Sequence, residues 1–190
     1  AVSSNVMSVD SQGNRRLIVK SQPQVRWDHV FEAAGPGSTY VFTPHMHARL
    51  VEQLGRLDTR SIGVHDWFLY ALARGIGGRW HIDPRPTLDY RQHGGNVQGE
   101  HRGLGAFRSR LEHLRSGFYG EQFLLIADAI RTVGEGHMAP AMLEDLDGLR
   151  EIIADRGFRG RAGILGRRGQ IRRSRREALE LALARVVGFW

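Results

Sequence analysis

The sequence predicts an α/β fold in which a mixed sheet with flanking helices is followed by an α-helical tail. Short runs of strand-forming residues alternate with helical patterns up to about Gly99, and beyond it the apolar residues recur only at helical spacing. The 190 residues are 41% hydrophobic, which is enough to bury a core. We therefore expect residues 1–100 to hold the sheet and residues 101–190 to form a helical extension with a basic amphipathic end.

Two strands joined by a turn are expected at the beginning of the chain. Valines spaced among small residues between Ala1 and Asp10 predict the first strand. The run Ser11-Gln12-Gly13-Asn14 is a turn signal, and Arg15 to Lys20 predicts the second strand. A short helix is then expected over Trp27 to Ala34, before the strand-forming run Ser38 to Thr43.

Two longer helices and two short strands complete the first part. The pair Thr43-Pro44 opens a helix, because threonine can cap a helix whose first residue is proline. A second helix is expected from about His65 to Ile76, where a glycine pair ends it. Two strands separated by prolines should follow, at Trp80 to Asp83 and at Thr87 to Arg91.

The region beyond Gly99 carries only helical signals. Apolar stripes at helical spacing occur on three segments, Leu104 to Leu114, Phe123 to Ile130 and Leu143 to Ile153. Glycines at every third position from Gly157 to Gly166 indicate a loop-rich stretch. The final helix, about Ile171 to Val187, begins with arginines and ends with apolar residues.

Composition and charge exclude several classes of function. The chain has no cysteine, so it cannot form disulfides, a thiolate metal site or a cysteine nucleophile. The formal net charge is +7, but residues 156–190 hold ten arginines against two glutamates, so the remainder is close to neutral. This concentration argues against nucleic acid as a partner of the whole surface and indicates a basic tail.

No apolar run approaches the roughly 18 residues that a membrane-spanning helix needs, and no signal-peptide pattern opens the chain. The basic final helix has three interpretations. It could be a solvated arginine face, an interfacial helix on an anionic membrane through residues 171–190, or a nucleic-acid contact, which no motif supports. We expect a cytoplasmic protein, peripheral at the inner face of the plasma membrane if that helix binds lipid.

Asp66 is the first candidate for chemistry. It falls at the expected start of a helix, where free backbone N–H groups and the helix dipole keep a carboxylate ionised and ready to accept a proton. The plain alternative is a helix cap without catalytic function. A second candidate is the run Tyr90 to Asn96, because its Arg91 can grip phosphate and its His93 can bind a divalent metal. An ordinary polar turn would also explain that run.

Taken together, these motifs resemble the family-2 glycosyltransferases of the GT-A fold, particularly the bacterial rhamnosyltransferase-like members. Between His65 and Gly99 the chain carries HDWF, GIGG, DPRP and YRQHGGNVQG, in the order and with spacing similar to that of the family. The resemblance is strong for about a fifth of the chain and weaker over nearly all of the rest. It implies the acceptor-side half of a GT-A-type mixed sheet for residues 1–100.

The resemblance also implies roles for individual residues. Asp66 matches the general base that deprotonates the acceptor hydroxyl in an inverting transfer. Arg91 and His93 match positions that contact the donor diphosphate, and His93 would also ligate a divalent metal, magnesium or manganese. Trp67 and His65 would bind the acceptor. The implied partners are a nucleotide-sugar donor, with rhamnose as a candidate sugar, and a saccharide or lipid-linked acceptor.

The chain departs from the family in one respect. It has no aspartate-rich metal motif of the kind that ends the nucleotide-binding half, and we expect Glu144, Asp145 and Asp147 to be a solvated helix face. We therefore expect the chain to be the C-terminal portion of an enzyme and inactive by itself.

Two hypotheses of other classes stay open at this point. One is a metal-dependent phosphohydrolase built around His65-Asp66, with His45 as a further ligand in an all-helical fold. A β-sheet over residues 1–20, 38–43 and 80–91 would contradict it. The other is a non-catalytic module that binds a membrane surface through its last helix.

Overall fold

The computed structural model describes residues 1–91 and 117–190. Its sheet contains β1 (Val2–Val9), β2 (Arg15–Ile18) and β3 (His81–Arg91), in the order β2-β1-β3. β1 pairs antiparallel with β2 and parallel with β3. The mixed α/β composition and the first two strands are confirmed.

β3 differs from the prediction because one strand replaces the two that were expected. Pro84 and Pro86 lie inside it, where neither can donate to a ladder. The strand tolerates them because it is an edge of the described sheet and because its register against β1 shifts around Asn5.

The expected strand over residues 38–43 is wrong. The structure has the 3-10 helix η1 (Gly37–Thr39) there, and Val41 forms only an isolated bridge with Val2. Local bonds explain the outcome, since the amide and the hydroxyl of Thr39 both donate to the carbonyl of Pro36, at 2.9 and 2.8 Å.

The helices of the first part agree with the prediction. They are α1 (Asp28–Phe31), α2 (Pro44–Leu54) and α3 (His65–Gly75). The expected cap of α2 is present, because the Thr43 hydroxyl accepts the amide N–H of Met46 at 3.2 Å.

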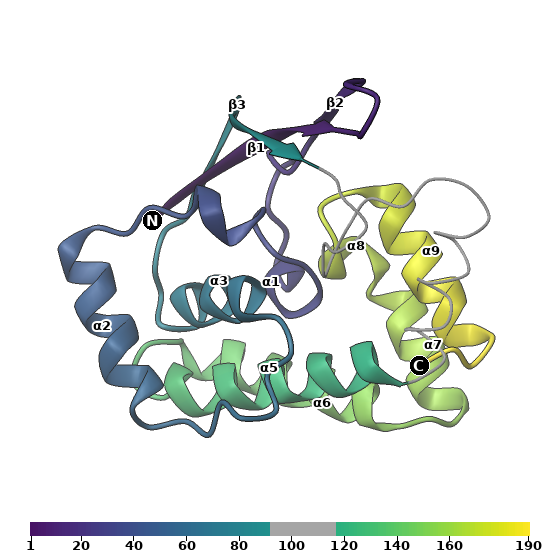
Figure 1. Ribbon diagram of the computed structural model, residues 1–190. Helices are drawn as coiled ribbons and strands as arrows, with labels where there is room; N and C mark the ends of the chain where they lie inside the picture. The colour runs from purple at the N-terminus through teal and green to yellow at the C-terminus, as the bar shows by residue number, and fades with distance from the viewer. Residues whose placement is uncertain (92–116) are drawn as a thin grey trace.

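The second part is helical. Its described helices are α5 (Phe118–Gly134), α6 (Pro140–Ala154), α7 (Phe158–Gly166), α8 (Arg168–Ile171) and α9 (Arg175–Val186). Figure 1 shows α1 and α3 between the sheet and the α5–α6 pair, with α7, α8 and α9 gathered at the end opposite α2. The helix expected over residues 104–114 lies outside the described residues.

Two predictions for the C-terminal part are wrong. The glycine-rich stretch from Gly157 forms α7 rather than a loop, because its glycines let α7 pack closely on α6. A Cβ on Gly163 would lie 2.8 Å from the side chain of Ile152. The single final helix is divided, since the chain is extended at Arg172 and α9 begins only after the cap residue Ser174.

One hydrophobic core draws on both parts of the chain. The ring of Phe123 in α5 lies 4.7 Å from that of Phe31 in α1, 5.5 Å from Trp67 in α3 and 4.9 Å from Trp190 near the C-terminus. The division into residues 1–100 and 101–190 stays a prediction, and its boundary lies outside the described residues. Among the described helices, none is long and apolar enough to cross a membrane.

Candidate active site

Asp66 lies in the first turn of α3, where that turn meets η1. Its Oδ2 accepts the amide N–H of Gly37 at 3.1 Å, and its Oδ1 accepts the amide N–H of Trp67 at 2.7 Å. The side chain stays partly exposed. The two backbone donors orient the carboxylate, and its partial exposure leaves room for a reacting group to approach.

The approach of η1 to Asp66 requires a residue without a side chain. A Cβ on Gly37 would lie 3.0 Å from the Cβ of Asp66 and 3.7 Å from the Nε2 of His65. Glycine thus permits a backbone amide to reach a carboxylate on another element.

Gln122 holds the loop that leads into α3, and no sequence pattern indicates this role. Its side chain is 2% exposed, accepts the amide N–H of Gly63 at 2.9 Å and donates to the carbonyl of Ser61 at 3.0 Å. These bonds join positions about sixty residues apart, so no local pattern could reveal them. Gln122 positions the residues immediately before Asp66.

Tyr40 completes the surroundings of the carboxylate. Burial, followed by the charge of Asp66, raises the pKa of the Tyr40 phenol above its ordinary value, so the group stays neutral. Its oxygen accepts the amide N–H of Ala34 at 3.2 Å. We define the Asp66 corner as Gly37, Tyr40, His65, Asp66 and the supporting Gln122.

The structure places the other predicted site residues unequally. His65 is exposed beside Asp66 at the start of α3. Arg91 is exposed at the last position of β3, in register with Val9. His93 and the glycines that follow it lie outside the described residues.

Trp67 requires a correction. Its side chain is 4% exposed, its Nε1 donates to the carbonyl of His29 at 3.0 Å, and its ring packs edge-on against Phe123. Since the ring belongs to the core, Trp67 does not form the acceptor wall that we expected. It anchors the helix on which Asp66 lies.

A second cluster of charges is buried beside α1. The guanidinium of Arg173 lies 3.1 Å from the carboxylate of Asp28 and 2.9 Å from that of Glu32, and all three side chains are at most 5% exposed. The hydroxyl of Tyr70 donates to Asp28 at 2.7 Å, and Arg74 lies 3.3 Å from the same carboxylate. This buried ion-pair network joins α1, α3 and the segment between α8 and α9.

We expected Asp145 to lie on a solvated helix face, but the structure places it among hydrogen-bond donors. Its carboxylate accepts the indole N–H of Trp27 at 2.8 Å and forms ion pairs with Arg26 and Arg167. The cost of its partial burial is outweighed by these donors, which hold the pKa of Asp145 below its ordinary value. Asp145 therefore connects α6 to the residues just before α1 and to Arg167, which lies between α7 and α8.

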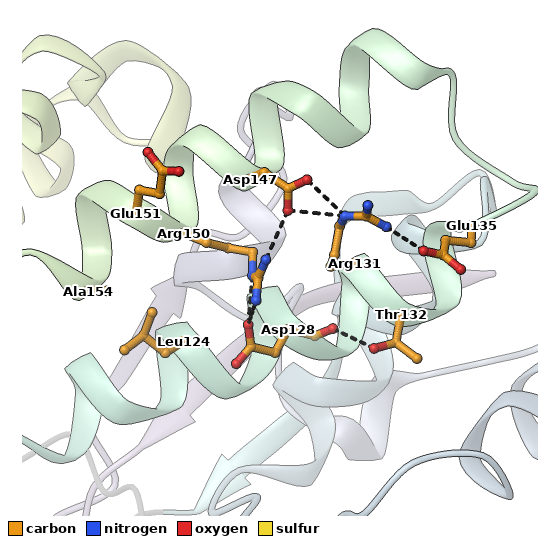
Figure 2. Close-up of a pocket in the computed structure, with 9 residues that line it drawn as sticks. All are labelled: Leu124, Asp128, Arg131, Thr132, Glu135, Asp147, Arg150, Glu151 and Ala154. Atoms are coloured by element: carbon orange, nitrogen blue, oxygen red, sulfur yellow. Dashed lines mark hydrogen bonds and ion pairs between the residues drawn. The ribbon is translucent and has the colours of Figure 1, made fainter.

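An open hollow of about 890 Å³ lies between α5 and α6 and contains none of the predicted site residues. Figure 2 shows that two arginines and three carboxylates of this hollow are paired with one another, whereas Glu151 in its lining has no such pair among the residues drawn. Arg150 lies between Asp128 and Asp147, and Arg131 lies between Asp147 and Glu135. Both arginines of the hollow are thus engaged by carboxylates, and neither is left to bind an anionic ligand.

The described residues contain no group of three or more histidine, aspartate or glutamate side chains that could hold a metal ion. The described residues therefore do not by themselves form a site for the divalent cation that we expected His93 to bind. The phosphohydrolase hypothesis fails on the fold, since β1, β2 and β3 form a sheet where that hypothesis requires helices throughout.

The comparisons with known proteins bear on this site. No family model and no solved structure matches the chain. It is 37% identical over 130 residues to dTDP-rhamnosyl transferase RfbG of Shigella flexneri, a stretch that covers 67% of this chain and 45% of that protein. The chain thus spans less than half the length of the curated relative that it matches.

The matched stretch bears directly on Asp66. A continuous stretch of two thirds of the chain must include its middle third, and Asp66 lies there. The similarity supports a rhamnosyltransferase-like glycosyltransferase, as the motifs between His65 and Gly99 predicted.

Proposed function

We propose that the protein containing this chain transfers a sugar from a nucleotide diphosphate donor to a hydroxyl of a saccharide or lipid-linked acceptor. One observation carries the proposal. Asp66 is a partly exposed carboxylate held by the amides of Gly37 and Trp67, in a stretch similar to a rhamnosyl transferase. That arrangement suits a general base whose orientation is set before the acceptor binds.

In the proposed reaction, Asp66 takes the proton of the acceptor hydroxyl. The acceptor oxygen then forms a bond to the anomeric carbon, while the bond from that carbon to the diphosphate oxygen breaks. Attack opposite the leaving group inverts the configuration of the sugar. The carboxylate has capacity for this proton, because each oxygen accepts one hydrogen bond from the described residues and has a further lone pair.

Finer features of the proposal come from the family resemblance. They are a GT-A fold of family 2, rhamnose carried on thymidine diphosphate, a cytoplasmic location, contacts of Arg91 and His93 with the diphosphate, and a magnesium or manganese ion. The ion would neutralise charge on the departing diphosphate. No step is routed through it, because the described residues do not form its site.

The test is Asp66→Asn in the full-length gene product that contains this chain. Loss of the base should lower kcat by about 10²- to 10⁴-fold, while nucleotide-sugar binding, measured by calorimetry, stays within a few-fold. Asp58→Asn is a matched control, since its carboxylate is exposed and, within residues 1–91 and 117–190, pairs only with Arg60. Full activity of Asp66→Asn would refute the assignment of the base.

His93→Ala tests the proposed diphosphate site separately. We expect weaker donor binding and an altered response to added magnesium or manganese. Unchanged metal dependence would show that His93 has a structural role only.

A further inference from the structure

α7 and α9 present apolar side chains to solvent at the end of the molecule opposite α2 (Figure 1). Phe158, in the first turn of α7, is 85% exposed. On α9, Leu179, Leu183 and Val187 recur at every fourth position and are 44%, 49% and 64% exposed. Residues four apart share a helix face, so these three form one apolar stripe. Several large apolar side chains that are exposed together on neighbouring helices indicate an interaction site.

The two apolar elements lie side by side. The guanidinium of Arg161, one turn after Phe158, donates to the carbonyl of Val186 at 3.2 Å. The same guanidinium lies 3.4 Å from where a Cβ of Gly188 would be. The first turn of α7 therefore adjoins the end of α9, where Val187 is exposed.

Unpaired positive charge surrounds Phe158. Arg156, Arg159 and Arg161 are exposed, and within the described parts of the chain none of them forms an ion pair. The nearby Asp155 accepts the amide N–H of Gly157. The acidic residues of α9 are already engaged, since Glu177 pairs with Arg172 and Glu180 with Arg176. We call Phe158, the three arginines and the α9 stripe the α7–α9 surface.

The structure corrects the membrane-binding interpretation of the sequence. One of the three interpretations of the final helix places the apolar residues of 171–190 at the lipid boundary. Trp190 is 8% exposed and packs against Phe123, and Leu181 is 7% exposed. Trp190 and Leu181 therefore belong to the core, whereas Leu179, Leu183 and Val187 of the same tail are exposed on the α7–α9 surface.

We propose that the α7–α9 surface docks on an anionic phospholipid membrane, with its apolar side chains at the boundary between headgroups and acyl chains. The unpaired arginines supply charge complementarity to lipid phosphates. Phe158 and the leucines supply buried apolar area, which binding to a phosphate backbone alone would not require. A membrane is therefore favoured over a nucleic acid.

The experiment is co-sedimentation of the 190-residue chain with vesicles of two parts phosphatidylcholine to one part phosphatidylglycerol. We expect binding that weakens with added salt and is at least tenfold weaker on pure phosphatidylcholine. Replacing Arg156, Arg159 and Arg161 by glutamine should lower the partition constant by on the order of 100-fold, and Phe158→Ser by about tenfold.

Matched controls lie at the α2 end of the molecule. Replacing Arg56, Arg60 and Arg79 by glutamine removes the same charge, and Val41→Ser removes a 65% exposed apolar side chain. Both should bind vesicles within a few-fold of the parent chain. All these positions are exposed, and circular dichroism melts confirm that each variant folds.

Three outcomes would overturn the proposal. They are absence of vesicle binding, equal loss in the control variants, and tighter binding of an RNA oligonucleotide that depends on the arginines but not on Phe158. The proposal does not rest on the transferase assignment, because Asp66→Asn should bind vesicles as the parent does.

Discussion

Asp28 and Asp66 occupy the same local position, in the first turn of a helix and next to a tryptophan, but their surroundings differ. Asp28 is fully buried and receives a hydrogen bond from Tyr70 and ion pairs from two arginines. Asp66 is partly exposed, and the hydrogen bonds that it receives within the described residues come from backbone amides. The first carboxylate is committed to the fold, and the second remains available for chemistry.

The two sites differ in the groups that surround the carboxylate, and these groups decide whether it can react. Side-chain cations around Asp28 compensate for its burial, so that removing one of them is expensive. Asp66 is oriented by a close backbone approach that needs glycine at position 37, and its loss should cost the fold little. Four predictions test whether Asp28 is a structural carboxylate and Asp66 a reactive one.

The largest effect is expected for Arg173→Ala. It leaves the buried carboxylates of Asp28 and Glu32 without their shared cation, which should lower the free energy of unfolding by about 3–5 kcal/mol in denaturant titrations. Arg176→Ala is the control, because its ion pair with Glu180 is exposed and should contribute little to stability. Similar losses in both variants would contradict the special role of the buried network.

The next effect concerns pH and His29. Burial lowers the pKa of His29 below its ordinary value of 6.5, and Arg74 and Arg173 act in the same direction against the opposing charge of Asp28. Below that value the unfolded chain binds a proton that the folded protein does not. Stability should therefore fall as the pH drops below 6.5, by at most about 1.4 kcal/mol for each pH unit.

His29→Phe should remove this part of the pH dependence, measured by urea unfolding at several pH values. A smaller fall at lower pH should remain, because Arg74 and Tyr70 still favour the charged form of Asp28 when His29 is gone, and that contribution is lost as the pH falls below 3.8. Burial alone would raise the pKa of Asp28, but His29, Arg74 and Tyr70 outweigh it. An unchanged profile in His29→Phe would show that His29 does not stay neutral in the folded protein.

A smaller effect on stability is expected for Gly37→Ala. The new Cβ must displace Asp66 by a few tenths of an ångström, which should lower the free energy of unfolding by about 1 kcal/mol and kcat by about tenfold. Gly169→Ala, where a Cβ meets nothing within 4 Å, should be neutral or slightly stabilising. If kcat of Gly37→Ala equals that of the parent, the approach of η1 does not orient the base.

The smallest change in stability is expected for Asp66→Asn. The amide oxygen can keep one of the two backbone hydrogen bonds, so the free energy of unfolding should change by about 0.5–1 kcal/mol. Asp28→Asn serves as the comparison and should cost several times more, since it weakens a buried ion pair. A large loss in Asp66→Asn would make Asp66 a structural cap, as the plain interpretation of its position holds.

Local signals predicted the helices well where a cap and an apolar period coincide. Thr43-Pro44 marked the start of α2, and the pattern after His65 marked α3. The same reasoning failed where tertiary packing reversed the local preference. Glycines from Gly157 predicted a loop, but they form a helix because their lack of side chains lets α7 approach α6.

The candidate site could be predicted only in part. Asp66 followed from its place in a recognisable motif, and its partner Gly37 and the support of Gln122 did not. Both contacts join residues separated by tens of positions, and no periodicity carries that information. Trp67 was misassigned for the same reason, since an aromatic residue at a helix start can face either solvent or the core.

The sequence by itself determined the α/β class, the positions of the main helices, the concentration of arginine after residue 155 and the carboxylate nominated as base. Only the tertiary structure decided which aspartate is buried, which tryptophans are core, and which arginines are unpaired. The physical reason is that caps and periods act within a few residues, whereas burial and ion pairing depend on neighbours distant in the chain. Caps and periodicity do not distinguish Asp28 from Asp66. Burial and ion pairing separate them, because Asp28 is buried among cations and Asp66 is partly exposed.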